Sequence, residues 1–126
     1  MGTELSISTG QMMALTEKEM IKPLIREIHL FDSYIAGTTR LEDASVLENL
    51  PEGTKLNLRR EDNKFDSNAI LILNEQGKKL GYVPEKDDII FARLMDAGKM
   101  LSAKVKNTEH HGSFTKIAIG IFLVDF

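Results

Sequence analysis

The sequence contains no cysteine, and this single absence excludes several kinds of chemistry. Disulfide bonds, thiolate zinc sites and cysteine nucleophiles all require cysteine, so this chain uses none of them. The sequence also lacks a basic N-terminal stretch followed by a short apolar segment, and it lacks the apolar run of roughly 20 residues that a membrane span needs. A chain without disulfides suits a reducing compartment. We therefore expect a cytoplasmic protein that does not enter a membrane.

An excess of positive charge is also missing. The chain has 16 Lys and Arg against 19 Asp and Glu, which gives a formal net charge of −3 at pH 7. Proteins that wrap long nucleic acids usually carry a strong positive excess, because they neutralise many phosphates at once. A nucleic-acid site in this chain must therefore be small and locally organised.

The common catalytic motifs do not occur: the sequence has no P-loop, no G-x-S-x-G and no H-E-x-x-H pattern. Acidic residues gather at positions 85–88, but the macrodipole explains such residues at the start of a helix. His110 and His111 are adjacent and would point to opposite faces of a strand, so together with His29 they suggest no metal site. We therefore predict a binding protein that is not an enzyme, with no catalytic residue, metal or cofactor.

What is present is the composition of one globular domain. The chain has 126 residues, 42% hydrophobic and 28% charged, which is enough for a core of its own. We divide it into an N-terminal arm, residues 1–28, and a β-rich domain, residues 29–126.

The N-terminal arm contains signals for a short helix. Thr16 and Glu19 match a capping box, and Pro23 would kink or end the helix. An apolar stripe on the arm either covers an open edge of the domain or contacts a partner protein. The stripe consists of Met20, Leu24, Ile25 and Ile28.

Alternating hydrophobicity predicts about six strands in the β-rich domain. They fall at residues 28–36, 54–60, 69–73, 79–83, 101–105 and 114–126. Helices are predicted at residues 41–50 and 85–98, with Ile89, Ile90 and Leu94 on the inward face of the second. Many short strands with one main helix and one or two short helices indicate a mainly β fold with α+β detail, a small β-barrel.

Polar side chains concentrate in the connection between the second and third predicted strands, from Asp62 to Asn68. Asx side chains shape loops by hydrogen-bonding to nearby backbone groups, and this alone would explain them. The functional alternative starts from Phe65, an aromatic ring in the same polar connection. An exposed ring can stack on a nucleic-acid base, a contact worth about 1–3 kcal/mol, and the neighbouring Asp66 can accept a hydrogen bond.

Three segments of the β-rich domain occur in a distinctive order. Ile35-Ala36-Gly37 precedes Arg60-Glu61-Asp62-Asn63-Lys64-Phe65-Asp66-Ser67-Asn68-Ala69-Ile70, and Leu80-Gly81-Tyr82-Val83-Pro84 follows. In this order and spacing, the chain resembles the HIRAN domain family over about residues 29–126. The resemblance implies an OB-like β-barrel that binds nucleic acid. In a eukaryotic member of the family, the domain captures the 3′-hydroxyl end of single-stranded DNA.

Carried over residue by residue, the resemblance implies a set of nucleic-acid-binding side chains. Phe65 and Phe114 match aromatic residues that stack on bases, and Asp66 matches the carboxylate that holds the terminal 3′-hydroxyl. Asn63 matches a polar residue of the same pocket, and Arg60 would assist in binding.

The sequence departs from the family pattern at several of these positions. Where the DNA-end binder has an Arg-Tyr pair after the first strand, this sequence has Thr39 and Arg40, although Arg40 can itself contact phosphate. Tyr82 replaces a His of the site, and Glu85 replaces a Lys.

These departures leave two hypotheses about the function. The first is recognition of single-stranded DNA 3′ ends, in the setting of DNA repair or replication-fork processing. The second is a protein-interaction or adaptor domain that has lost most DNA contacts.

Overall fold

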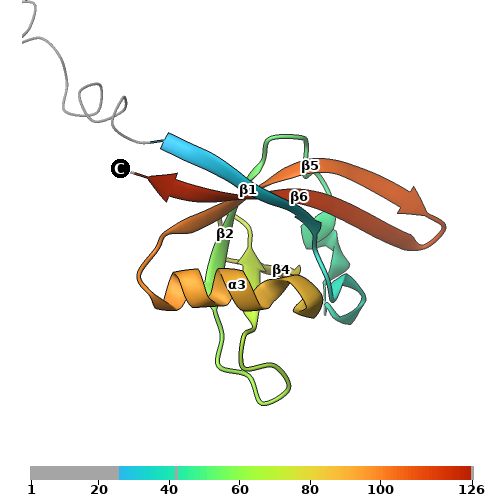
Figure 1. Ribbon diagram of the computed structural model, residues 1–126. Coiled ribbons are helices and arrows are strands. Elements are labelled where there is room, and N and C mark those ends of the chain that lie inside the picture. The colour runs from blue at the N-terminus through green and yellow to red at the C-terminus, as the bar shows by residue number, and fades with distance from the viewer. Residues whose placement is uncertain (1–25, 42, 126) are drawn as a thin grey trace, which may run out of the picture.

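A computed structural model describes residues 26–41 and 43–125 of the chain. The described strands are β1 (Arg26–Tyr34), β2 (Lys55–Arg60), β3 (Ile70–Leu73), β4 (Lys79–Tyr82), β5 (Leu101–His111) and β6 (Phe114–Asp125). They form one antiparallel sheet in the order β1-β6-β5-β2-β3-β4 (Figure 1). One α-helix, α3 (Glu85–Asp96), and two short 3-10 helices, η2 (Thr38–Arg40) and η3 (Ala44–Leu47), accompany it. The predicted mainly β class, with six strands and one main helix, is confirmed.

A single hydrophobic core joins the sheet to α3. The long strands alternate as the sequence predicts, because successive side chains of a strand point to opposite faces. The buried hydrophobic residues of β5 and β6 are Leu101, Ala103, Val105, Ile117, Ile119 and Ile121. By contrast, all residues of β3 (Ile70–Leu73) are buried, which agrees with the continuous apolar run that marks this strand in the sequence.

The predicted OB-like β-barrel is not confirmed, because the sheet stays open. Its end strands, β1 and β4, are not hydrogen-bonded neighbours in the strand order. The chain just beyond β1 does reach β4 through an isolated bridge, in which Ala36 and Tyr82 exchange backbone hydrogen bonds of 2.8 and 2.9 Å. This bridge draws the segment after β1 to the end of β4, so residues from both can share one pocket.

Gly81 permits this close approach of two backbones. A Cβ at this position would lie 2.3 Å from the Ala36 carbonyl oxygen and 2.6 Å from Ile35 Cγ2. Both atoms belong to the segment that bridges to β4, and Ile35 is itself buried. A glycine is needed here because any larger residue would push the bridging segment away.

We expect Gly81→Ala to lower the free energy of unfolding by about 3 kcal/mol, because the added methyl group forces the two backbones apart. Gly77→Ala is the matched control. Gly77 has a φ of 84° but nothing within 4 Å of an added Cβ, so this variant should lose only about 1 kcal/mol of conformational strain. Urea unfolding measures both variants. Equal losses in the two would contradict the steric explanation.

The second predicted helix is present as α3. Its predicted inward face is confirmed at Leu94, which packs partly buried against the core, but it is wrong at Ile89 and Ile90. Ile89 and Ile90 are 48% and 66% exposed, and the buried residues are Asp88, Phe91 and Ala92. These three follow the i, i+3, i+4 spacing of one helix face. The prediction failed because it assigned an acidic residue of this face to the solvent.

Two predictions concern segments beside the sheet. The helix predicted over residues 41–50 is present only as η3 within the described residues. The capping box and helix of the N-terminal arm lie outside the described residues.

β1 includes Arg26 to Tyr34, so the boundary that the sequence suggested between positions 28 and 29 falls inside this strand. Among the described residues, no helix is long and apolar enough to cross a membrane.

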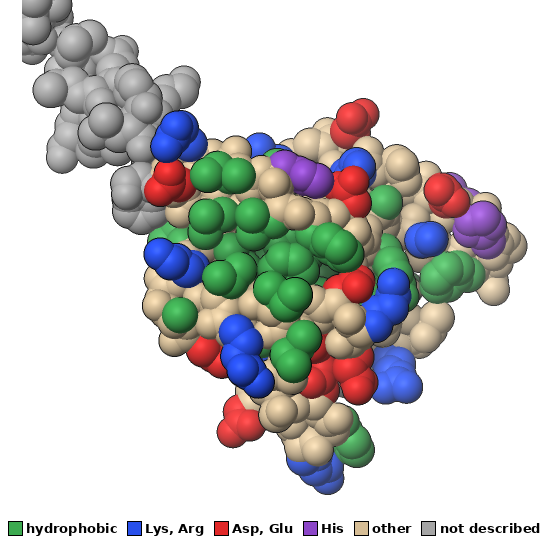
Figure 2. All heavy atoms as spheres, in the orientation of Figure 1, with side chains coloured by type: hydrophobic (Ala, Val, Ile, Leu, Met, Phe, Trp, Pro, Cys, Tyr) green, Lys and Arg blue, Asp and Glu red, His purple; other side chains and the backbone are tan. Residues whose placement is uncertain are grey.

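Hydrophobic side chains also gather on the surface between β1 and α3 (Figure 2). Ile28, Leu30 and Phe31 of β1 and Ile89 and Ile90 of α3 are between 37% and 66% exposed. The Phe31 ring lies 5.6 Å from the ring of Phe91 on α3, centroid to centroid. This β1–α3 apolar surface therefore continues the core outward at the end of the sheet.

Candidate nucleic-acid interface

The loop between β2 and β3, residues 61–69, projects from the body of the molecule (Figure 1). Its Asx side chains hold its shape. Asn63 Oδ1 accepts the backbone N–H of Phe65 at 2.7 Å, and Asp66 Oδ1 accepts the backbone N–H of Asn68 at 2.8 Å. The loop-shaping interpretation is confirmed for Asn63 and Asp66. It is compatible with a binding role, because Phe65 itself is 83% exposed.

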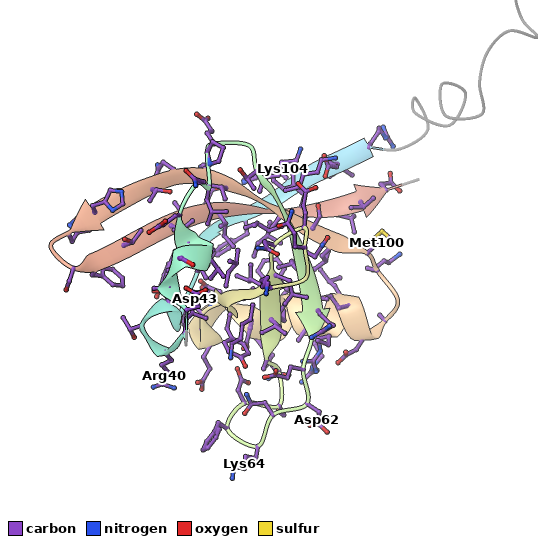
Figure 3. All side chains as sticks on the ribbon, turned by 180° about the vertical axis from the view of Figure 1, so that it is seen from behind. Arg40, Asp43, Asp62, Lys64, Met100 and Lys104 are labelled. Atoms are coloured by element: carbon purple, nitrogen blue, oxygen red, sulfur yellow. The ribbon has the colours of Figure 1, made fainter. Side chains whose placement is uncertain are left out.

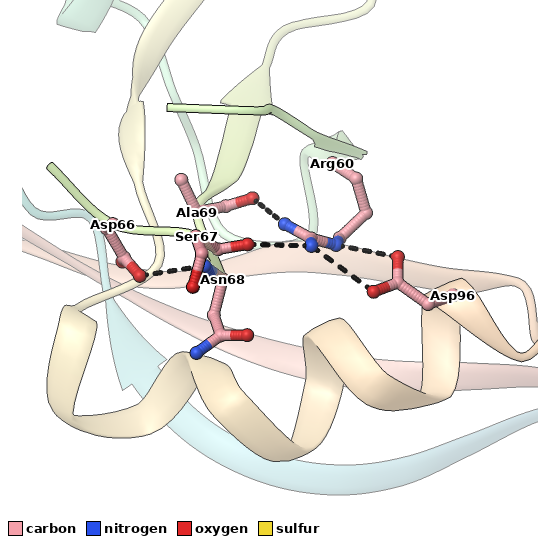
Figure 4. A network of polar contacts seen from close by, with 6 residues as sticks. All are labelled: Arg60, Asp66, Ser67, Asn68, Ala69 and Asp96. Atoms are coloured by element: carbon pink, nitrogen blue, oxygen red, sulfur yellow. Dashed lines mark hydrogen bonds and ion pairs between the residues drawn. The ribbon is translucent and has the colours of Figure 1, made fainter. Parts of the chain in front are cut away.

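Arg60 ties the base of this loop to α3 (Figure 4). Its Nε and Nη2 donate to the two carboxylate oxygens of Asp96 at 2.8 and 3.2 Å, and this hydrogen bonding lowers the pKa of Asp96. The same guanidinium donates to the carbonyl oxygens of Ala69 at 2.6 Å and Ser67 at 2.9 Å. These contacts hold Arg60 as a support of the loop.

A pocket of about 570 Å³ lies beside the loop, and we call it the Asp66 pocket. The loop contributes Asn63, Phe65 and Asp66; the segment after β1 contributes Thr39 and Arg40; β4 and the start of α3 contribute Lys79, Tyr82 and Glu85. Two cations, Arg40 and Lys79, and two carboxylates, Asp66 and Glu85, line this pocket. It therefore suits a small group with both donors and acceptors better than a long run of phosphates. In the part of the chain that the structure describes, no three His, Asp or Glu side chains gather as metal ligands would.

Glu61 links polar groups at the edge of the Asp66 pocket. Its Oε2 accepts the Tyr82 hydroxyl at 2.6 Å and the side-chain amide of Asn63 at 3.1 Å. Lys79 Nζ donates to the Tyr82 hydroxyl at 3.2 Å and lies 4.6 Å from the centroid of its ring. The hydrogen bond from Tyr82 lowers the pKa of Glu61. Glu61 therefore stays charged and holds Asn63 and Tyr82 in position.

A second pocket, of about 950 Å³, contains Phe114, which is 42% exposed, and we call it the Phe114 pocket. Thr39 lines both this pocket and the Asp66 pocket, so the two adjoin. Although the Phe114 pocket is larger, most of the predicted site residues lie in the other one. Arg40, which lines the Asp66 pocket, lies at the same end of the molecule as Asp62 and Lys64 of the projecting loop (Figure 3).

The structure brings most of the predicted site residues together. The Asp66 pocket holds Thr39, Arg40, Asn63, Phe65, Asp66 and Tyr82. Phe114 lies in the adjoining pocket, and Arg60 is not among the residues that line either one. The sequence analysis did not assign Lys79, which lines the pocket, or Glu61, which orders its edge.

A β-bulge explains why Lys79 was missed. Strict alternation would place Lys79 and Tyr82, three residues apart, on opposite faces of β4. The pairing with β3 shifts at this point, since Gly81 pairs with Ile72 and Lys79 pairs with Leu73. The shift brings Lys79 to the same side as Tyr82. The signal in the sequence was Gly81, because a single glycine within a strand often marks a bulge.

Comparisons with known proteins identify the family of this chain. The family model described as HIRAN domain matches residues 28–123. The match spans more than half of the sequence, and the chain belongs to the HIRAN domain family. HIRAN domains are generally nucleic-acid-binding modules.

Two crystal structures share the fold. A protein from Lactobacillus plantarum is 25% identical, with a TM-score of 0.74, and the match covers 81% of this chain and 99% of that one. The HIRAN domain of human HLTF is 17% identical, with a TM-score of 0.64, and the match covers 82% of each chain. No curated protein matches the sequence.

Proposed function

We propose that this protein is a binding module for the 3′ ends of single-stranded DNA, in the setting of DNA repair or replication-fork processing. The observation that carries the proposal is the Asp66 pocket, which is lined by two carboxylates, an exposed aromatic ring and two cations. The fold shared with the HIRAN domain of human HLTF supports it.

Each group in the pocket has a distinct part in the proposed binding. The Phe65 ring stacks on the terminal base, since it is exposed and every base offers an aromatic face. Asp66 accepts a hydrogen bond from the terminal 3′-hydroxyl, because an ionised carboxylate is an acceptor only. Arg40 and Lys79 contact the last phosphate groups. All of these contacts are non-covalent, and the proposal is binding without a chemical step.

Fluorescence anisotropy with single-stranded oligonucleotides tests the proposal. An oligonucleotide that ends in a 3′-hydroxyl should bind at low salt, and the same oligonucleotide with a 3′-phosphate should bind much more weakly. The phosphate removes the hydroxyl donor and adds negative charge beside Asp66 and Glu85. Equal binding of the two, or no binding of either at low salt, would refute end recognition.

Lys79→Gln should weaken binding of the 3′-hydroxyl oligonucleotide by a few-fold and flatten its salt dependence. For single strands, each neutralised phosphate contributes roughly −0.7 to the slope of log K against log salt, so the slope should change by about this amount. Lys99→Gln is the control, since Lys99 is an exposed residue that does not line the Asp66 pocket. A titration over several salt concentrations measures both variants, and identical slopes would exclude Lys79 from phosphate contact.

A second candidate function is protein interaction, as in an adaptor domain. The β1–α3 apolar surface favours it, because contiguous exposed apolar side chains often mark an interaction site. The two functions differ in one simple result: an adaptor that has lost its DNA contacts shows no oligonucleotide binding even at low salt.

A further inference from the structure

Asp88 is a buried acidic residue that the proposed contacts with DNA do not use. It lies on α3 and is 1% exposed, and its Oδ2 has no hydrogen-bond partner among the described residues. A charged carboxylate in this position is costly, because burial removes its hydration and no donor replaces the lost water. A protonated carboxyl group is far less costly to bury, and its O–H becomes a hydrogen-bond donor.

The surroundings of Asp88 favour this protonated form. Burial has the largest effect on the pKa of Asp88, and the neighbouring carboxylate of Asp66 has the next largest, followed by the charge of Glu85. Together they raise the pKa of Asp88 to about 7. Arg60 is the group that acts in the opposite direction. Its guanidinium is already engaged by Asp96, so it neutralises Asp88 only in part. These groups come from the projecting loop, from α3 and from β2.

We propose that Asp88 is a positioning residue of the Asp66 pocket: as a neutral carboxylic acid, it donates its O–H to Asp66 and fixes the carboxylate that receives the terminal hydroxyl. This inference rests on the proposed function. The proton belongs on Asp88, because Asp66 is only partly buried and already accepts the backbone N–H of Asn68 at 2.8 Å. A carboxylate has about four lone-pair sites, so Asp66 can accept hydrogen bonds from Asn68, Asp88 and a ligand hydroxyl together.

Loss of the proton reverses this arrangement. Above the pKa of Asp88, two neighbouring carboxylates repel each other, and the donor that held Asp66 is gone. Binding of a 3′-hydroxyl end should therefore weaken as the pH rises through about 7.

The folding stability of the protein should also fall as the pH rises. The folded chain holds the Asp88 proton more tightly than the unfolded chain does, so stability falls as the pH rises between the ordinary aspartate value of 3.8 and about 7.

The variant Asp88→Asn tests the inference, because asparagine keeps the size and an N–H donor but does not titrate. Anisotropy with a 3′-hydroxyl oligonucleotide, measured from pH 5.5 to 8.5, should show that the unmodified protein loses about tenfold in affinity. The variant should change by less than about twofold. His110 lines the adjoining Phe114 pocket and is the same in both proteins, so it does not produce a difference between their profiles. Parallel profiles in the two proteins would overturn the inference.

A second measurement separates this inference from the proposed function. The ¹³C resonance of the Asp88 carboxyl group, followed by NMR in the unmodified protein without DNA, should titrate with a midpoint of about 7. A midpoint near 4, the ordinary range of an aspartate, would overturn the inference even if DNA binds. If the midpoint is near 7 but no oligonucleotide binds at pH 6, the proposed function fails. The role of Asp88 in binding then fails with it, and only the protonated carboxyl pair remains.

Discussion

Replacing Asp66 with asparagine should weaken binding of a 3′-hydroxyl oligonucleotide by about 10- to 150-fold. A hydrogen bond to a charged group contributes about 1.5–3 kcal/mol, and this variant removes the charge. The introduced asparagine would still offer an Oδ1 to the backbone N–H of Asn68, which Asp66 Oδ1 accepts at 2.8 Å, so the loop should keep its shape. Anisotropy at pH 6 measures the loss.

A measurement of folding stability by urea unfolding is the control for Asp66→Asn. With Asp88 neutral at pH 6, the introduced asparagine keeps an Oδ1 that can accept the Asp88 O–H, so the urea midpoint of the variant at this pH should stay close to that of the unmodified protein. A variant that unfolds earlier would mean that the weakened binding reflects a damaged loop. Unchanged affinity in a stable variant would exclude Asp66 as the hydroxyl acceptor.

Phe65→Ala should weaken the same binding by about 5- to 150-fold, which corresponds to the 1–3 kcal/mol of one base stacked on an aromatic ring. The ring is 83% exposed, so its removal should leave the urea midpoint nearly unchanged. Phe65→Trp should retain or improve the affinity, because tryptophan offers a larger surface for stacking.

Ile90→Ala is the matched control for Phe65→Ala. Ile90 is also a large hydrophobic residue, 66% exposed, but it lies on the β1–α3 apolar surface and not in the Asp66 pocket. Its truncation should not change oligonucleotide binding. If both variants lose affinity equally, general loss of apolar surface explains the effect, and stacking by Phe65 does not.

Most of the strands could be predicted from the sequence because their burial follows a simple period. The hydrophobic residues of β5 and β6 alternate along the buried part of each strand, and β3 is apolar throughout, so each pattern has one direct structural meaning. The position of Phe65 in a polar connection likewise predicted its exposure. In these places the local pattern and the tertiary structure agree.

The closure of the sheet could not be predicted, because it depends on pairing between distant segments. The sequence indicated a barrel, whereas β1 and β4 remain the two ends of an open sheet. Only the contact between Ala36 and Tyr82 joins them among the described bridges. The same dependence on register hid Lys79, whose side of the strand is set by the bulge in β4.

Asp88 escaped prediction for a different reason. Hydrophobic periodicity treats every carboxylate as solvent-facing, so the inward face of α3 was drawn through Ile89 and Ile90. In fact Asp88 occupies the buried face together with Phe91 and Ala92. A sequence pattern does not record protonation, and a neutral carboxyl group can fill a position that a charged one cannot.

The most direct test of the central claim is a thermodynamic cycle at pH 6 with two oligonucleotides. One ends in a 3′-hydroxyl, and the other ends in a dideoxy nucleotide that lacks only this hydroxyl. Each is titrated with the unmodified protein and with Asp66→Asn. If Asp66 receives the terminal hydroxyl, the variant loses about 10- to 150-fold with the first oligonucleotide and little with the second, a coupling of about 1.5–3 kcal/mol. An equal loss with both oligonucleotides would contradict the claim, because the carboxylate would then act without the hydroxyl.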